Sequence, residues 1–192
     1  MNVVIVSIVV AAFVIAVTVL SSRAARHRSA VLTKVANDLD WTDVRVSTFH
    51  ATKVRGMRNG VSVSMTHKPR HKSTPERIVT LIEVPAPGRL IVRKRVAGFL
   101  SNKPWLGPPI LDHAELWIRA DDRTLAGRFL DHRERLDLVR RNLATRFDEL
   151  RVDGRGIRVE RAVEGSTWGF DEAAAKKVAK EEWDLALAMS RT

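Results

Sequence analysis

Cysteine and tyrosine are both absent from this 192-residue chain. Without cysteine the protein forms no disulfide, offers no thiol nucleophile and builds no cysteine-ligated zinc site. The lack of disulfides agrees with a domain in the reducing cytoplasm, although it does not require one. The lack of tyrosine, with only Phe49 inside the expected strands, removes the aromatic platform on which nucleic-acid bases stack. These absences argue against nucleic acid as the partner.

Charge is absent from the N-terminal end, because no charged side chain precedes Arg23. Residues 3–20 are apolar apart from Ser7 and Thr18, and as a helix they would span roughly 27 Å. That length matches the hydrocarbon core of a bilayer, where a segment must be helical to satisfy its own backbone hydrogen bonds. We predict a single transmembrane anchor over residues 1–22.

Two other interpretations of this run stay open. A secretory signal peptide would be cleaved, and Ser21, Ala24 and Ala25 could mimic a cleavage site. Against it, the apolar run is long, a basic flank follows it, and no basic side chain precedes it. The other alternative is a buried core helix, although so long an uncharged run at a chain end rarely has that use.

The basic residues flanking the run lie only on its C-terminal side: Arg23, Arg26, Arg28 and Lys34. By the positive-inside rule, the N-terminus lies outside and the bulk of the chain lies in the cytoplasm. We therefore expect a protein of the cell inner (plasma) membrane, with a juxtamembrane helical stalk over residues 23–40 and a cytoplasmic domain over residues 41–192.

Acidic residues are scarce in the first part of that domain. Between residues 44 and 104 only Glu76 and Glu83 are acidic, whereas the bases are Arg45, Lys53, Arg55, Arg58, Lys68, Arg70, Lys72, Arg77, Arg89, Arg93, Lys94, Arg95 and Lys103. The net charge of +11 is therefore concentrated near the predicted membrane. Such charge is a solvated sheet face, a surface for the anionic lipid headgroups of the cytoplasmic leaflet or, as a third alternative, a surface for nucleic acid.

Turn signals predict an α+β domain with a mostly antiparallel sheet and packed helices. Asn59-Gly60 is a strong hairpin signal, Pro85 and Pro87 mark a second turn, and residues 153–156 mark a third. We expect a strand ending near Met57, strands over 61–67, 78–84, 89–95, 115–119, 147–152 and 157–162, and helices over 24–38, 122–130, 132–145 and 170–189.

Three segments are candidates for contact with lipid or a partner. Residues 67–75 form a basic, Pro-bounded loop that we expect to be a mobile hairpin tip. The apolar loop 97–109 contains Trp105 and either packs under the sheet or enters the membrane interface. The last helix is apolar on two sides, and Trp183 lies on the second side. That second side packs in the core, which we prefer slightly, or it contacts a second copy of the chain or another partner.

The motifs for chemistry are weak. His67 and His71 lie in a cationic loop that is poorly suited to bind a metal. Acid–base groups are available in the pairs Asp112–His113, Asp121–Asp122 and Asp131–His132. Of these, Asp121, Asp122 and Asp131 are better explained as helix caps. Asp131 and Glu134 have the spacing of a capping box. Gly154 and Gly156 form no phosphate loop, because no helix starts there.

The sequence thus predicts a membrane-anchored, non-enzymatic accessory or scaffold protein without a cofactor or metal. Its basic domain would contact anionic lipid headgroups, a protein partner or a second copy of the chain. The alternatives are a membrane-tethered enzyme using Asp and His groups, and a nucleic-acid-binding module. The residues expected to bind lipid or a partner are Arg23, Arg26, Arg28, Lys68, Arg70, Lys72, Arg93, Lys94, Arg95, Trp105 and Trp183.

Overall fold

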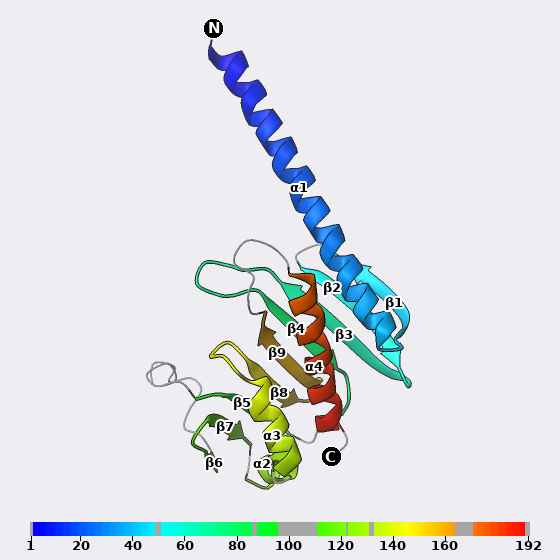
Figure 1. The fold of residues 1–192 in the computed structure, drawn as a ribbon, viewed down its shortest axis with the longest axis vertical. Coiled ribbons are helices and arrows are strands. Elements are labelled where there is room, and N and C mark those ends of the chain that lie inside the picture. The colour runs from blue at the N-terminus through cyan, green and yellow to red at the C-terminus, as the bar shows by residue number, and fades with distance from the viewer. Residues whose placement is uncertain are drawn as a thin grey trace.

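The computed structural model describes residues 2–48, 51–85, 88–95, 111–121, 123–130, 133–163 and 171–190. The helices are α1 (Asn2–Asp38), α2 (Arg123–Leu130), α3 (Arg133–Asn142) and α4 (Glu172–Ser190). The strands are β1 (Thr42–Ser47), β2 (Thr52–Arg58), β3 (Val61–Lys68), β4 (Arg77–Ile82), β5 (Leu90–Lys94), β6 (Leu111–Asp112), β7 (Leu116–Ala120), β8 (Glu149–Asp153) and β9 (Gly156–Ala162). The predicted α+β class with an N-terminal apolar helix is confirmed (Figure 1).

Helix α1 is continuous, but its two halves have different surroundings. Its first half extends away from the domain (Figure 1), and apolar side chains such as Phe13 and Leu20 are 68% and 66% exposed. An 18-residue stretch of the helix has a mean hydropathy of 2.2 and no buried residue. Thr18 Oγ1 donates to the Val14 carbonyl at 2.7 Å, so this polar residue is satisfied within the helix. The exposed apolar helix is compatible with a membrane anchor or a signal sequence.

The second half of α1 belongs to the folded domain. Val31, Leu32, Val35 and Ala36 are buried, and the helix packs on β1, β2 and α4. The segment expected to be a stalk is therefore partly core. A continuous helix that is bare at one end and buried at the other fixes the domain close to the apolar segment.

The described strands form one antiparallel sheet in the order β1-β2-β3-β4-β9-β8-β5-β7-β6. The Asn59-Gly60 hairpin is confirmed: both residues have positive φ, at 50° and 77°, and Arg58 pairs with Val61 across a two-residue turn. The β8–β9 hairpin is confirmed as well. The pairs β4–β9 and β5–β8 join strands far apart in sequence, and these the sequence did not predict.

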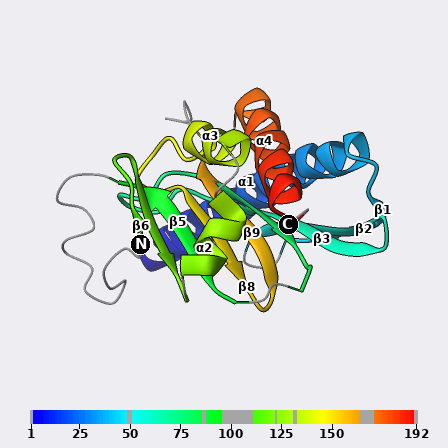
Figure 2. The same cartoon turned by 90° about the horizontal axis from the view of Figure 1, so that it is seen from below.

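Helices α1, α3 and α4 lie on one side of the sheet (Figure 2). A single row of side chains crosses seven strands beneath them and is buried throughout: Val54, Met65, Thr80, Val159, Leu150, Val92 and Ile118. Thr80, the polar member of this row, donates to Glu182 of α4 at 2.6 Å. The neighbouring rows point to the opposite face, because side chains alternate along a strand.

The last helix resolves one open alternative. Trp183 is 2% exposed and packs on Trp41, which follows α1. Trp41 in turn covers Gly56 of β2, where an added Cβ would lie 2.9 Å from the Thr42 carbonyl oxygen and 3.3 Å from the Trp41 ring. The second apolar side of α4 is therefore core, as slightly preferred, and Trp183 does not present a surface to a partner.

Helix α3 ends at Asn142, three residues before the predicted end at 145, and Asn142 Nδ2 donates to the Leu138 carbonyl at 2.9 Å. The capping residue expected at Asp131 lies outside the described residues, as does the apolar loop 97–109.

Candidate anion-binding site

The sheet face opposite α1, α3 and α4, here called the basic face, carries rows of charged side chains. In one row Glu160 of β9 pairs with Glu149 of β8, which pairs with Arg93 of β5. In the next row Arg158 pairs with Arg151. Like charges directly opposite one another across strands are unfavourable. This arrangement therefore needs compensation from neighbouring rows.

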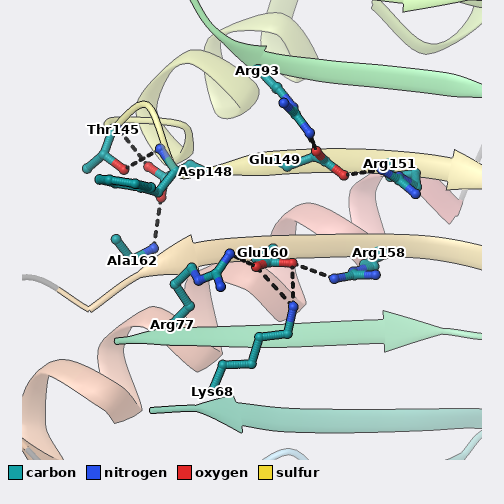
Figure 3. A network of polar contacts seen from close by, with 11 residues as sticks. Lys68, Arg77, Arg93, Thr145, Asp148, Glu149, Arg151, Arg158, Glu160 and Ala162 are labelled. Carbon is teal, nitrogen blue, oxygen red and sulfur yellow. Dashed lines mark hydrogen bonds and ion pairs between the residues drawn. The ribbon is translucent and has the colours of Figure 1, made fainter. Parts of the chain in front are cut away.

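Glu160 is the centre of the first cluster (Figure 3). Its side chain is 8% exposed and accepts hydrogen bonds from three cations. Lys68 Nζ lies 3.1 Å from both carboxylate oxygens, and Arg77 and Arg158 each donate to one of them. A single carboxylate neutralises only one of these charges, so the cluster keeps a surplus of two positive charges (three minus one).

Glu149 is the centre of the second cluster (Figure 3). Its side chain is 12% exposed, and it accepts from Arg93 Nε at 2.7 Å and from Arg151 at 2.9 Å. Arg93 comes from β5, so this carboxylate ties two strands together. The second cluster has a surplus of one positive charge (two minus one).

The two clusters line one hollow of about 430 Å³, together with Thr74, Arg146 and Phe147. Among the arginines around it, the Nε atoms of Arg77, Arg151 and Arg158 are buried and have no hydrogen-bond partner. A buried N–H without a partner costs on the order of 1–3 kcal/mol. Because solvent does not reach these Nε atoms, a ligand in the hollow would meet the exposed parts of the same side chains, which are 36% exposed for Arg151 and for Arg158.

A buried aspartate positions the segment that carries Arg146. Asp148 is 2% exposed, and its carboxylate accepts from the Ala162 N–H at 2.8 Å and from the Thr145 N–H at 2.6 Å (Figure 3). Burial raises the pKa of Asp148 above its usual range, against the opposing effect of these hydrogen bonds. Arg146 then lies with its guanidinium 4.8 Å from the centre of the Phe147 ring. Hydrogen bonds from the backbone to a buried carboxylate thereby hold this end of the hollow in place.

The electrostatics of the site follow from this crowding. Burial raises the pKa of Glu160, but the charges of Lys68, Arg77 and Arg158 outweigh it and hold the pKa below its usual range. Burial lowers the pKa of Lys68; Glu160 opposes this effect, while Arg158 and Arg77 reinforce it. The neighbouring cations thus favour the ionised form of Glu160, whereas burial is the main cause that disfavours the charged form of Lys68.

The three consecutive bases predicted on β5 do not act together. Arg93 points to the basic face and enters the hollow. Lys94 follows it on the strand and so points to the other face. Arg95 donates to the His113 carbonyl at 3.0 Å. Of the predicted lipid- or partner-binding residues, Lys68 and Arg93 alone line this hollow in the described structure.

Other predicted residues form a second group near the apolar part of α1. Arg70 and Lys72 are exposed at the β3–β4 connection, which Figure 1 shows at the end of the domain from which α1 extends. Arg23 and Arg26 are exposed on α1, and Arg28 is half-buried. The predicted hairpin tip is short: His71 and Thr74 pair through backbone hydrogen bonds at 2.8 and 3.1 Å. Trp105 lies outside the described residues.

Sequence reasoning missed Arg77, Arg146, Arg151 and Arg158 as site residues. A local signal exists for some of them: Glu149 and Arg151, like Arg158 and Glu160, are two apart on a strand and share a face. No local sequence pattern predicts that β4 pairs with β9, and this pairing brings Arg77 close to Glu160.

His67 and His113 make contacts within the fold and do not line the hollow. His67 is 1% exposed and pairs with buried Glu76, so it belongs to the domain interior rather than to the exposed tip expected from residues 67–75. His113 Nδ1 accepts from the backbone N–H groups of Glu115 and Leu116 at 3.2 and 3.1 Å. Within the described ranges no group of three or more His, Asp or Glu side chains is placed to hold a metal ion.

Comparison with known proteins adds no family: no family model, curated protein or solved structure matches the chain.

Proposed function

We propose that this chain is a single-span protein of the cell inner (plasma) membrane, with its N-terminus outside and its α+β domain in the cytoplasm. There it is a non-enzymatic accessory or scaffold protein whose basic surfaces hold anionic headgroups or an acidic protein partner at the membrane. One observation supports the proposal most directly: exposed bases, Arg70 and Lys72 among them, lie at the end of the domain from which the exposed apolar half of α1 extends.

The geometry supports headgroup contact by the β3–β4 connection. Arg70, His71 and Lys72 are exposed there, and Figure 1 shows the connection at the end of the domain from which α1 extends. Arg23 and Arg26 follow the apolar run directly. Bases within a Debye length of an anionic leaflet each gain on the order of 1 kcal/mol.

A fluorescence measurement on the full chain in lipid nanodiscs tests this proposal. Because the chain has no cysteine, Ser73→Cys at the exposed connection takes a single environment-sensitive label. We expect a blue-shifted, salt-sensitive spectrum in discs that contain anionic phospholipid, but not in zwitterionic discs. The double variant Arg70→Gln/Lys72→Gln should abolish the difference between the two discs.

A matched control removes the same charge elsewhere. Arg123 of α2 and Arg155 of the β8–β9 turn are exposed, and the turn lies at the opposite end of the sheet from the β3–β4 connection. Arg123→Gln/Arg155→Gln should leave the shift unchanged. Identical spectra in both kinds of disc would refute headgroup contact at this connection.

A further inference from the structure

We propose that the hollow on the basic face is a binding site for a phosphoryl group, carried by a lipid headgroup or by a free phosphate. The proposal deepens the proposed function, since it names the chemistry that one basic surface of the domain recognises. It concerns the hollow between the two carboxylate-centred clusters, to which the β3–β4 connection contributes Thr74 but none of its exposed bases.

The charge of the hollow calls for an anion with more than one negative charge. Leaving Arg146 aside, five cations line it against two carboxylates among the described residues, which leaves a surplus of three (five minus two): Lys68, Arg77, Arg93, Arg151 and Arg158 against Glu149 and Glu160. A monocarboxylate would offset one of these charges. A phosphate monoester or inorganic phosphate carries up to two near neutral pH, together with several acceptor oxygens.

The arginines that line the hollow indicate the same kind of ligand. Arg77, Arg151 and Arg158 line the hollow from β4, β8 and β9, and each keeps part of its side chain exposed. Arginine presents its N–H donors in a planar fork that matches phosphate oxygens. A tetrahedral phosphoryl group offers acceptors in several directions at once, as donors arriving from three different strands require.

The site is built rather than a chance gathering of flexible side chains. Glu160 and Glu149 are nearly buried, and each fixes cations from more than one strand. Arg151 and Arg158 are direct cross-strand partners, an unfavourable contact that a bound dianion between them would relieve. The carboxylates set the positions of the guanidinium groups, and the surplus charge is left for the ligand.

Calorimetry on the full chain in phosphate-free maltoside micelles tests the proposal. Inorganic phosphate is the probe, and we expect saturable binding. Arg151→Gln/Arg158→Gln should weaken it by at least about tenfold, since it removes two charged donors. Arg55→Gln/Arg119→Gln is the matched control, because these exposed arginines lie in the same cross-strand row but outside the hollow.

A second variant separates loss of binding from loss of folding. Arg151→Lys/Arg158→Lys keeps the charge but loses the planar fork, so we expect intermediate affinity with an unchanged far-ultraviolet circular dichroism spectrum. Equal affinity in the glutamine variant and the control pair, or no saturable heat with phosphate, would overturn the proposal. Binding of an oligo-aspartate peptide without binding of phosphate would overturn it in favour of an acidic protein.

The source of the phosphoryl group is decided in the same experiment. Micelles doped with phosphatidic acid present a phosphate monoester on a lipid. Suppression of the phosphate heat by this lipid would assign the site to a headgroup, and persistence of the heat would assign it to free phosphate. The nanodisc measurement depends on Arg70 and Lys72, which do not line the hollow, and the phosphate measurement depends on Arg151 and Arg158, so each proposal can fail without the other.

Discussion

The rings of Trp41 and Trp183 pack with their centroids 5.6 Å apart and their planes tilted by 57°. Trp41 follows the end of α1, and Trp183 lies in the middle of α4, so this contact joins the N-terminal helix to the C-terminal one. Arg58 of β2 lies 4.9 Å from the centre of the Trp183 ring and extends the contact to the sheet. The position of the domain beneath the apolar segment depends on this junction.

Removing the Trp183 ring should therefore destabilise the domain. Trp183→Ala leaves a cavity against Trp41, and we expect a loss of about 3–5 kcal/mol in the free energy of unfolding. Trp183→Phe keeps part of the packing and should cost less. Urea unfolding of the full chain in detergent, followed by circular dichroism, gives both values. Val46→Ala serves as the control because Val46 is 46% exposed, and a similar loss there would contradict the assignment.

Two glycines of one hairpin should respond very differently to substitution. Gly156 has φ of +127°, and an added Cβ would lie 2.1 Å from the Ile82 carbonyl oxygen on the neighbouring strand. Gly154 has no heavy atom within 4 Å of that position. Gly156→Ala should lose about 2–5 kcal/mol in unfolding free energy, whereas Gly154→Ala should change it by less than about 0.5 kcal/mol. Equal effects would mean that β9 does not lie against β4 as described.

Glu160 should stabilise the domain only when it is ionised. Its folded-state pKa lies below the usual value of 4.5, so its contribution is present above that pH and is lost as the pH falls through the lowered pKa. We expect Glu160→Gln to cost about 1–3 kcal/mol at pH 7, because it leaves Lys68, Arg77 and Arg158 without their shared acceptor. The difference between the two proteins should shrink in acid. Unfolding curves at a series of pH values measure this, and a pH-independent difference would contradict the cluster's role.

Glu182 should show the opposite dependence. It is fully buried, one of its carboxylate oxygens has no partner, and burial raises its pKa well above 4.5 despite the hydrogen bond from Thr80. An acid with a raised folded-state pKa lowers stability as the pH rises above the unfolded value, because the folded protein must keep the proton or bury a charge. Glu182→Gln should therefore gain about 1–3 kcal/mol at pH 7 and little near pH 4. A gain that did not grow with pH would exclude this explanation.

Local features of the fold were predictable from the sequence, whereas distant pairings were not. The Asn59-Gly60 turn can be predicted from the sequence because both residues tolerate positive φ. The alternation of apolar and polar residues between turns predicted the ends of most strands to within two residues of their observed positions. By contrast, β4 pairs with β9 across more than seventy residues, and nothing in either strand's own composition specifies that partner. The sheet order is decided by packing of the whole domain.

The candidate site shows the same division. The sequence shows an excess of bases between residues 44 and 104, and it identified Lys68 and Arg93 as candidates for binding lipid or a partner. The carboxylates that organise them, Glu149 and Glu160, come from the later, charge-balanced part of the chain. Net charge by segment therefore could not reveal a site in which acids from one half position bases from the other.

The orientation of the chain in the membrane is the prediction on which the proposed partners depend. Bases follow the apolar run, and none precedes it, so we expect the N-terminus outside. The absence of cysteine allows single labels at Asn2→Cys and, in a separate protein, Ser190→Cys. An impermeant maleimide applied to intact cells should label only the first, and lysed cells should show both positions reactive. Labelling at position 190 in intact cells would place the domain outside, where it would meet envelope or surface partners instead of the cytoplasmic leaflet. Loss of the position 2 label from the mature protein, with a shortened chain, would identify the apolar helix as a cleaved signal sequence.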